Sequence, residues 1–355
     1  MADQEGTAEP KKVDLVFQGG GVKGIALVGA LSVIEEKGYV PNDLAGASAG
    51  AICAALVAAG YTAAELKDVL ENTDFFSFED RGWEDRIPLA GIPFSILTDH
   101  GIFEGKAFQD WMAGLLAKKG ITKFGQLRDE TAEDERFRYR LQVIVSDVTD
   151  RQLLCLPKDA ALIGIDDPDD LDIAHAVRMS MSIPIFFEPV TVTDKTKKEH
   201  VLVDGGMLSN FPVWVFDDGT GDPPWPTFGL KLVDPDPKKV VPGEAPPIAV
   251  KHTGVKGLID FLMGLVSTMT DAHDKLYLER DSFVRTITIS NCGVKTTQFD
   301  LNDVTKEELY QSGVTAANDF FATWDFEGYK REFRDKPPAR RATVGKLMQE
   351  AAAKS

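Results

Sequence analysis

The chain has 355 residues, 43% of them hydrophobic, and it carries a formal net charge of −17 at pH 7. This length and composition allow one large α/β domain or two small ones, with a sizeable core. The excess of acidic residues argues against nucleic acid as a partner and against long-range attraction to an anionic membrane. Any contact with lipid would therefore depend on inserted apolar side chains or on a local basic patch.

Signals for targeting and for disulfides are weak. The three cysteines, Cys53, Cys155 and Cys292, are too scattered for a disulfide framework or a zinc site, which predicts a reduced, cytoplasmic compartment. Residues 1–12 are polar and of mixed charge, so we expect a tail rather than a signal peptide. The longest apolar run, Ala45–Ala59, is too short to span a bilayer.

The first sixty residues predict two rounds of strand, turn and helix. An apolar strand at Val13–Phe17 leads into the glycine-rich turn Gly19–Gly24 and then into a helix that continues to Ile34. A second strand, Leu44–Ala47, ends at a serine, and a helix of small residues follows to Ala59. Both turns therefore stand between a strand and a helix.

The second turn fits G-x-S-x-G, the nucleophile elbow, with Gly46, Ser48 and Gly50 at the fixed positions. Such a turn lifts a serine hydroxyl clear of the backbone, and the two glycines let strand and helix pass closely. The N-terminal N–H groups of the helix that follows would face the oxygen that becomes negative during acyl transfer. Taken alone, the pentapeptide also fits a tightly packed helix start.

The first turn offers successive unobstructed backbone N–H groups, which suit an oxyanion or a phosphate. Its glycines also fit the dinucleotide pattern G-x-G-x-x-G, and they are Gly19, Gly21 and Gly24, with Gly20 between them. A dinucleotide site needs a strand that ends in an acidic residue about 20 residues later. In that window we expect Pro41 to interrupt any strand, so the dinucleotide interpretation is disfavoured.

A carboxylate could serve as the base for the serine. Asp204 ends a short apolar strand and precedes Gly205 and Gly206, which would place it at the carboxyl edge of a sheet. Taken alone, an Asp-Gly pair is more often just a turn. Asp147 and Asp150 are rival acids, but a hairpin accounts for them more simply.

Together, these three motifs resemble the patatin-like phospholipase family, of bacterial type, over roughly residues 12–235. The segment Arg178–Phe187 resembles the stretch that precedes the acid in that family. The resemblance implies a Ser–Asp dyad without histidine, with Ser48 as the nucleophile and Asp204 as its base. It further implies an oxyanion hole made by N–H groups from the region of Gly20 and Gly21 and from Ala49.

The dyad raises a problem of basicity, because an aspartate with an ordinary pKa of about 3.9 is a poor base at neutral pH. We expect apolar neighbours, such as Val203 and Phe211, to desolvate Asp204 and raise its pKa. Asn210 could brace the site. Ser180 and Ser182 are rival nucleophiles without flanking glycines, and we rank them behind Ser48.

A histidine triad is the rival mechanism, because His252 and His273 follow Asp204 in the order Ser…Asp…His. Both stand in polar surroundings that are more typical of surface residues.

Four other segments each allow two interpretations. Residues 81–94, with Trp83 and Phe94, fit a loop that folds into the core better than a lid or lipid-docking surface. Lys195–Lys198 fits a solvated hairpin tip or a phosphate-facing patch, and Leu258–Val266 a core helix or a dimer face. The end of the chain, 336–355, is a frayed helix or a weak basic arm.

The other predicted elements are helices at 61–78, 103–119, 171–182 and 305–324 and strands at 139–148, 152–156, 200–204, 227–233 and 285–289.

We therefore predict a single three-layer α/β domain at 13–325, a largely parallel central sheet with helices on both faces, between a tail at 1–12 and a basic, Ala-rich extension at 326–355. The predicted function is lipid acyl hydrolysis of the phospholipase A or lysophospholipase type. The substrate would be a phospholipid or another lipid ester, with peripheral membrane contact and a homo-oligomer as further options. We expect no cofactor and no metal, because no cluster has ligand spacing, and hence no calcium dependence. Acyl transfer, a Ser-His-Asp esterase and a lipid-binding regulatory effector remain as alternatives.

Overall fold

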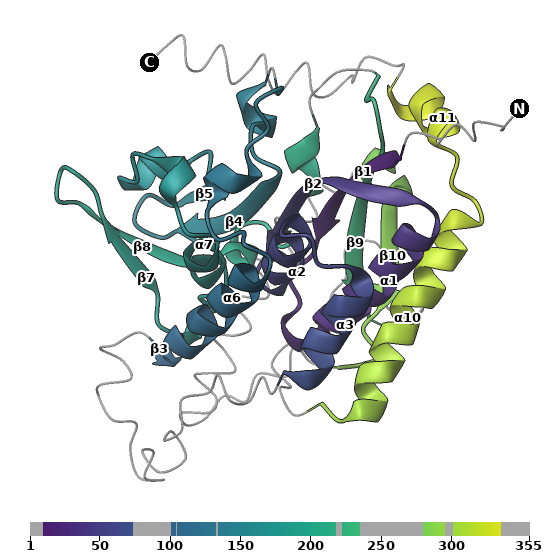
Figure 1. The fold of residues 1–355 in the computed structure, drawn as a ribbon, viewed down its shortest axis with the longest axis horizontal. Helices are drawn as coiled ribbons and strands as arrows, with labels where there is room; N and C mark the ends of the chain where they lie inside the picture. Colours follow the sequence, from purple (N-terminus) through teal and green to yellow (C-terminus); the bar gives the residue numbers. More distant parts are fainter. Residues whose placement is uncertain are drawn as a thin grey trace, which may run out of the picture.

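A computed structural model describes residues 10–73, 101–103, 105–132, 134–217, 222–234, 280–294 and 301–334. Eight strands form one mixed sheet in the order β10-β9-β1-β2-β4-β8-β7, with β5 beside β4 (Figure 1). The strands of this sheet are β1 Lys11–Phe17, β2 Tyr39–Ala47, β4 Leu141–Asp147, β5 Gln152–Leu156, β7 Val190–Thr193, β8 Glu199–Asp204, β9 Thr227–Val233 and β10 Thr286–Ser290. The helices are α1 Gly24–Glu36, α2 Ala49–Ala58, α3 Ala63–Asn72, α6 Lys106–Lys118, α7 Ile173–Ser180, α9 Arg280–Val284, α10 Asp303–Phe321 and α11 Phe326–Tyr329.

The sheet has a parallel half and an antiparallel half. Strands β10, β9, β1, β2 and β4 run parallel, whereas β5 and β8 pair antiparallel with opposite edges of β4 and β7 pairs antiparallel with β8. Two short strands, β3 Gly101–Phe103 and β6 Ile185–Phe187, make a separate parallel pair. The predicted α/β domain with a largely parallel sheet is confirmed.

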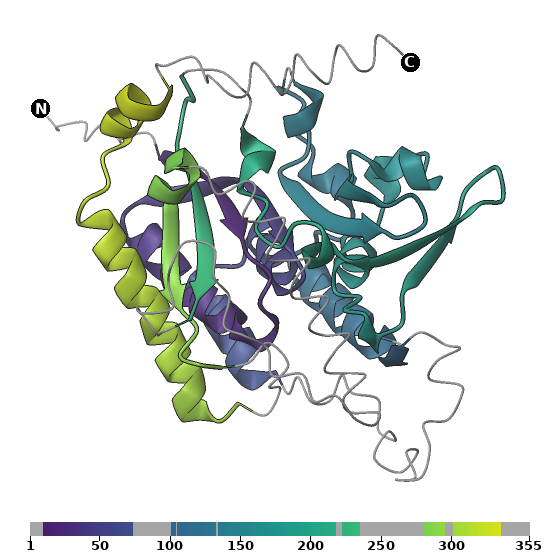
Figure 2. The same cartoon turned by 180° about the vertical axis from the view of Figure 1, so that it is seen from behind.

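Alternating side chains divide the core between the two faces of the sheet. Leu15 and Phe17 join the large cluster packed by α1, α2, α3, α6, α7 and α10, whereas Val16 belongs to a smaller cluster on the other face. Figure 2 shows this second face, where the turn Val213–Phe216 covers part of the parallel strands. Phe211 also lies in the smaller cluster.

The prediction that Pro41 interrupts any strand was wrong. Strand β2 continues through Pro41 because the register with β1 shifts there, so that Val13 pairs with Pro41 and Leu15 with Leu44. The one extra residue of β2 is accommodated by Asp14, whose Oδ1 accepts the N–H of Asp43 at 3.1 Å. Such a bulge removes the need for a ladder bond at a proline.

Regular secondary structure extends past both predicted domain limits, residues 13 and 325. Strand β1 begins at Lys11, two residues inside the predicted tail. The described part of the C-terminal extension is helical as far as residue 334, where Arg334 Nη2 pairs with Asp217 at 2.8 Å. The same buried carboxylate pairs with Arg285 at 2.8 Å. This ion pair network attaches the segment to the sheet.

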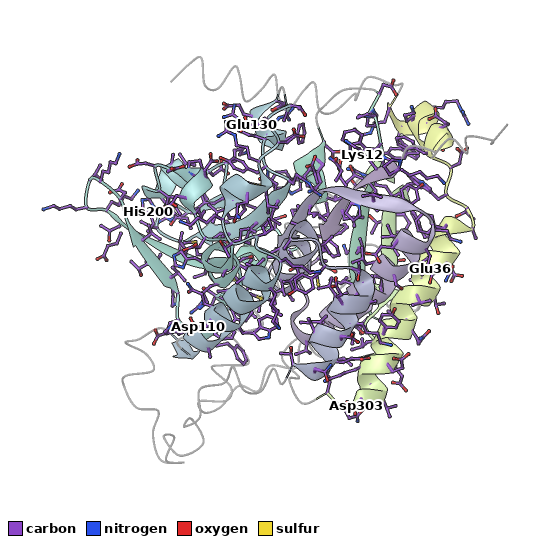
Figure 3. All side chains as sticks on the ribbon, in the orientation of Figure 1. Lys12, Glu36, Asp110, Glu130, His200 and Asp303 are labelled. Atoms are coloured by element: carbon purple, nitrogen blue, oxygen red, sulfur yellow. The ribbon has the colours of Figure 1, made fainter. Side chains whose placement is uncertain are left out.

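Charged side chains lie on the outer sides of the helices, where Figure 3 shows Glu36, Asp110 and Asp303. Among the residues that the structure describes, no helix is both long enough and apolar enough to cross a membrane.

Candidate active site

Ser48 occupies a strained turn between β2 and α2. Its backbone has φ 53° and ψ −131°, a conformation that few residues other than glycine adopt and that costs on the order of 1–3 kcal/mol. The side chain is only 5% exposed. The Ser48 N–H donates to Ser180 Oγ at 2.9 Å. The strained geometry is that of the predicted elbow.

The two elbow glycines are required by close backbone contacts. A Cβ on Gly46 would lie 2.3 Å from the carbonyl oxygen of Gly50, and a Cβ on Gly50 would lie 2.1 Å from that of Phe17. No side chain fits at either position without moving backbone. The sequence pattern therefore reflects the tight crossing of β1, β2 and α2.

The glycine-rich turn lies directly against Ser48. A Cβ on Gly19 would stand 3.0 Å from the Cβ of Ser48 and 2.1 Å from Asn210 Oδ1. The Gly19 N–H donates to the carbonyl of Asn210 at 3.0 Å, and Asn210 Nδ2 donates to the carbonyl of Gly19 at 3.2 Å. Asn210 thus holds the turn in place, as expected from the sequence. The Gly19 N–H is therefore engaged in holding the turn.

Asp204 ends β8 beside this serine. Its Oδ1 accepts the N–H of Gly206 at 2.7 Å, and its own N–H donates to the carbonyl of Ser182 at 2.9 Å. Its Oδ2 is buried and, within the described residues, has no hydrogen-bond partner. Burial raises the pKa of Asp204 to about 7, against the opposing effects of the Ser48 hydroxyl and the Gly206 N–H.

The Ser48 hydroxyl is close enough to lower the pKa of Asp204, yet the two side chains do not form a hydrogen bond of ordinary geometry. In this structure Ser48 Oγ instead points to Met181 Sδ, at 3.6 Å. We interpret Ser48 and Asp204 as neighbours whose side chains form a hydrogen bond when Ser48 Oγ rotates away from Met181 toward Asp204.

The order of the strands explains why two residues so distant in sequence meet. Strands β2 and β8 pair with the same edge of β4, because β5 occupies its other edge, and Ala47 lies opposite Ile144 while Asp204 lies opposite Val145. Ile144 and Val145 are consecutive residues of β4, so the carboxyl ends of β2 and β8 meet along this edge. The turns that follow Ala47 and Asp204 therefore begin side by side, which brings the serine and the carboxylate together.

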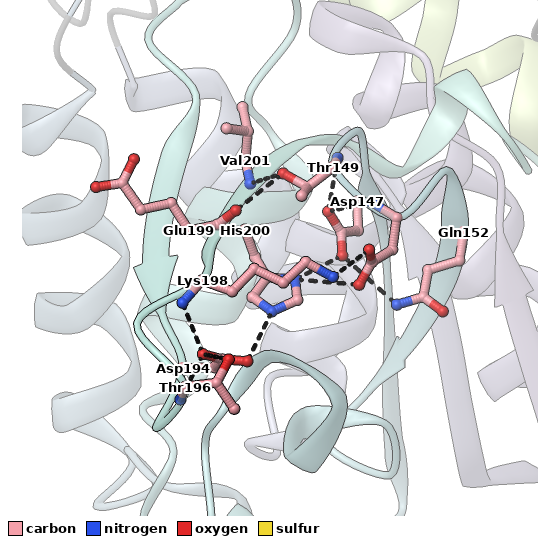
Figure 4. A network of polar contacts seen from close by, with 10 residues as sticks. Asp147, Thr149, Gln152, Asp194, Thr196, Lys198, Glu199, His200 and Val201 are labelled. Atoms are coloured by element: carbon pink, nitrogen blue, oxygen red, sulfur yellow. Dashed lines mark hydrogen bonds and ion pairs between the residues drawn. The ribbon is translucent and has the colours of Figure 1, made fainter.

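The rival acids lie elsewhere, in a polar network under the β7–β8 hairpin (Figure 4). His200 is 1% exposed; its Nδ1 lies 2.9 Å from Asp147 Oδ2, and its Nε2 lies 3.7 Å from Asp194. Asp150 also pairs with Lys198. Because His200 precedes Asp204 by four strand residues, the network lies roughly 13 Å along β8 from it.

Asp147, Asp150 and His200 are the one group in the described part of the chain whose ligand atoms lie close enough together, within 4.8 Å, to hold a metal ion. The ammonium of Lys198 already neutralises Asp150, and the imidazole already engages Asp147. The charges and hydrogen bonds of the network are thus largely satisfied without a metal. We interpret it as the polar support that joins the β7–β8 hairpin to β4.

Ser180 and Ser182 do not resemble nucleophiles in this structure. Ser180 is fully buried, and its Oγ donates to the carbonyl of Ile144 at 2.7 Å. Ser182 is also fully buried, and its Oγ donates to the carbonyl of Arg178 at 3.0 Å. Their contacts with Ser48 and Asp204 were not anticipated, although the resemblance of Arg178–Phe187 to a family segment marked the region.

Several predicted features lie outside the described residues. These are the aromatic segment 81–94, the apolar segment Leu258–Val266, the tail at 336–355, and the triad candidates His252 and His273.

Comparison with known proteins identifies the family of the chain. A family model described as patatin-like phospholipase matches residues 15–217, more than half of the chain. The chain belongs to the patatin-like phospholipase family. This membership supports a lipid hydrolase activity in general.

Relatives extend the match beyond the family segment. Protein YqhO of Bacillus subtilis is 36% identical over 318 residues, which are 88% of this chain and 99% of YqhO. Protein R571 of Acanthamoeba polyphaga mimivirus is 22% identical over 86% of this chain and 94% of its own length. The NTE family protein Rv2565 of Mycobacterium tuberculosis is 26% identical over 57% of this chain, a match that spans only 27% of that protein.

Among solved structures, VipD from Legionella pneumophila matches with a TM-score of 0.48 and 18% identity, over 89% of this chain and 67% of that one. The effector ExoU matches with a TM-score of 0.43 and 14% identity, over 92% of this chain and 54% of that one.

Proposed function

We propose that this patatin-like protein hydrolyses an acyl ester bond of a phospholipid or lysophospholipid through an acyl-Ser48 intermediate. The proposal rests on one observation: Ser48, on a strained turn, neighbours a carboxyl group whose pKa burial raises to about 7. A base of this pKa is half deprotonated near neutral pH and can accept the proton of a serine hydroxyl.

In the first half-reaction, Ser48 Oγ attacks the ester carbonyl carbon while its proton passes to Asp204. The C–O bond to the glycerol oxygen then breaks, and Asp204 returns the proton to that departing oxygen. A lysophospholipid leaves when the substrate is a diacyl phospholipid, and the fatty acyl group remains on Ser48.

In the second half-reaction, water attacks the acyl carbon and Asp204 accepts a proton from it. The bond to Ser48 Oγ breaks, the serine recovers its proton, and a free fatty acid leaves. If an alcohol or a thiol takes the place of water, the same two residues carry out acyl transfer.

Negative charge on the carbonyl oxygen builds up in both half-reactions. The N–H of Ala49 belongs to the first turn of α2 and therefore lacks an intrahelical acceptor. With Gly20 and Gly21 across the turn, it forms the proposed oxyanion hole. The positive end of the α2 dipole adds to the stabilisation.

The proposed substrate lies in a membrane or micelle, so we also propose peripheral contact with a lipid surface. The net charge of −17 means that this contact depends on apolar insertion or on a local basic patch rather than on overall charge.

Mass spectrometry of products from mixed phospholipid vesicles tests the proposal with wild type, Ser48→Ala and Asp204→Asn. We expect free fatty acid and lysophospholipid from the wild type, and neither from the two variants. Ser312→Ala, on α10, is the matched control. The Ser312 hydroxyl donates only to the carbonyls of Ser290 and Leu309.

Three results would contradict the proposal. Full activity in Ser48→Ala would show that Ser48 is not the nucleophile. Acyl groups found on an added alcohol, with no free fatty acid, would make the protein an acyltransferase. Lipid binding without any product would instead favour the effector alternative.

A further inference from the structure

Three consecutive residues at the end of α7 contact both members of the proposed dyad. Ser180 Oγ accepts the backbone N–H of Ser48 at 2.9 Å, and Met181 Sδ lies 3.6 Å from Ser48 Oγ. The carbonyl of Ser182 accepts the backbone N–H of Asp204 at 2.9 Å. One short segment therefore sets the position of the serine backbone, the serine hydroxyl and the aspartate backbone.

The hydroxyl of Ser180 has a defined direction. It donates to the carbonyl of Ile144 at 2.7 Å, which leaves its oxygen lone pairs to accept the N–H of Ser48. Ile144 lies on β4, the strand with which both β2, which leads into Ser48, and β8, which ends at Asp204, are paired. Ser180 thus ties the elbow to the centre of the sheet.

This bond matters because Ser48 is strained. A residue at φ 53° returns to a more common conformation unless its surroundings hold it. The N–H of Ser48 is buried, and without Ser180 Oγ it would lose the hydrogen bond that it makes here. Loss of that bond therefore favours a turn in which Ser48 Oγ is displaced from Asp204.

The segment is itself anchored by a buried arginine. Arg178 Nη1 donates to Ser182 Oγ at 2.5 Å, and Nη2 donates to the carbonyl of Glu188 at 2.8 Å. The guanidinium also lies over the ring of Phe187, 5.4 Å from its centre. Arg178 is 3% exposed, so these bonds are shielded from water. The anchor makes Ser180 a fixed reference point rather than a mobile side chain.

We propose that Ser180 is a positioning residue for the reaction of Ser48, and that its hydroxyl holds the elbow in its reactive conformation. This inference rests on the proposed function, since it needs Ser48 to be the nucleophile. Ser180 acts through the Ser48 backbone and does not touch substrate.

Active-site titration separates positioning from simple loss of folded protein. A fluorophosphonate ester that labels activated serines gives both the number of reactive sites and the rate constant for labelling each site. We expect Ser180→Ala to lower kcat and the labelling rate per titrated site by roughly 10- to 100-fold, because a displaced nucleophile reacts more slowly. KM should stay as in the wild type, since the substrate contacts are untouched. The controlling pKa of the pH profile should not fall, since a displaced Ser48 hydroxyl no longer lowers the pKa of Asp204.

Variants that keep part or all of the interaction complete the test. Ser180→Thr retains the hydroxyl and should recover most of the rate per site. Ser180→Cys, a weaker acceptor of similar size, should fall between Ala and wild type, and it serves if Ser180→Ala does not fold. Ser312→Ala removes a serine hydroxyl from α10 and should react at the wild-type rate.

A merely structural role for Ser180 predicts fewer sites that each react at the wild-type rate, and this result in Ser180→Ala or Ser180→Cys overturns the inference. Failure of the proposed function is a different result: wild-type protein is then not labelled, or the label is mapped to a residue other than Ser48.

Discussion

Gly19 lies so close to Ser48 that a Cβ added at position 19 would stand 3.0 Å from the Cβ of the serine. It would also stand 2.1 Å from Asn210 Oδ1, a side chain that is itself bonded to the Gly19 carbonyl. The glycine turn therefore packs directly against the nucleophile elbow and restricts the position of Ser48.

We predict that Gly19→Ala lowers kcat/KM by about 100-fold or more, because a displacement of the order of 1 Å has that effect on a positioned nucleophile. Gly24→Ala is the matched control: its Cβ would make an ordinary contact, 3.8 Å from Cys53 Sγ, and its φ of −52° suits any residue. Steady-state kinetics on both variants checks this. Equal losses in both variants would mean that the turn tolerates no side chain for reasons other than its contact with Ser48.

The pKa of Asp204 predicts the pH dependence of the reaction. Burial raises this pKa to about 7, and the carboxylate must be deprotonated to act as a base. The value of kcat/KM should therefore be constant above pH 8 and fall about tenfold for each unit of pH below 6. A controlling pKa near 4, as for an exposed aspartate, would show that Asp204 is not the base.

The same shift has an effect of opposite sign on stability. Since the folded-state pKa of Asp204 exceeds its unfolded value of about 3.9, its contribution to stability is complete below pH 3.9 and is lost as pH rises through 7. Asp204→Asn, which stays neutral, should therefore be inactive and yet at least as stable as the wild type in urea unfolding at pH 8. A less stable variant would indicate that the carboxylate charge supports the fold.

The dyad predicts that no histidine takes part in catalysis. In the part of the chain that the structure describes, His200 is engaged with Asp147, away from Ser48, and His175 lies on α7. We predict that a double variant, His252→Ala with His273→Ala, retains activity within a few-fold of wild type. Kinetics together with a circular dichroism spectrum of the variant decides the matter, because a folded but inactive double variant requires the triad.

Local patterns were sufficient to predict the elements and the motif glycines. The alternation around Val16 and the steric demands of Gly46 and Gly50 both arise from residues near in sequence or from one tight crossing. The pairing of β2 and β8 with one edge of β4, which brings Ser48 beside Asp204, could be expected only through the family resemblance.

Two features depend on contacts that no local pattern encodes. Pro41 is tolerated inside β2 because Asp14, 29 residues before Asp43, accepts the displaced N–H of the bulge. Ser180 supports a residue 132 positions earlier in the chain, and its sequence context shows only a buried helix end. In both cases the hydrogen-bond acceptor is a side-chain oxygen far away in the sequence, so no local sequence pattern reveals the contact.

The last prediction concerns the segment that closes the described structure, which is attached by one buried and one exposed ion pair. The Asp217 side chain is 7% exposed and pairs with Arg285 and Arg334, whereas Asp222 is 84% exposed and pairs with Lys330 at 2.9 Å. Asp217→Ala leaves two buried guanidinium groups without this carboxylate and should lower the free energy of unfolding by about 3–5 kcal/mol. Asp222→Ala removes a solvated pair and should lower it by about 1 kcal/mol or less. Urea unfolding of both variants measures the difference. Similar small losses would mean that water reaches Arg285 and Arg334 once Asp217 is removed, and that the attachment of residues 326–334 depends on the rings of Trp324 and Tyr329 instead.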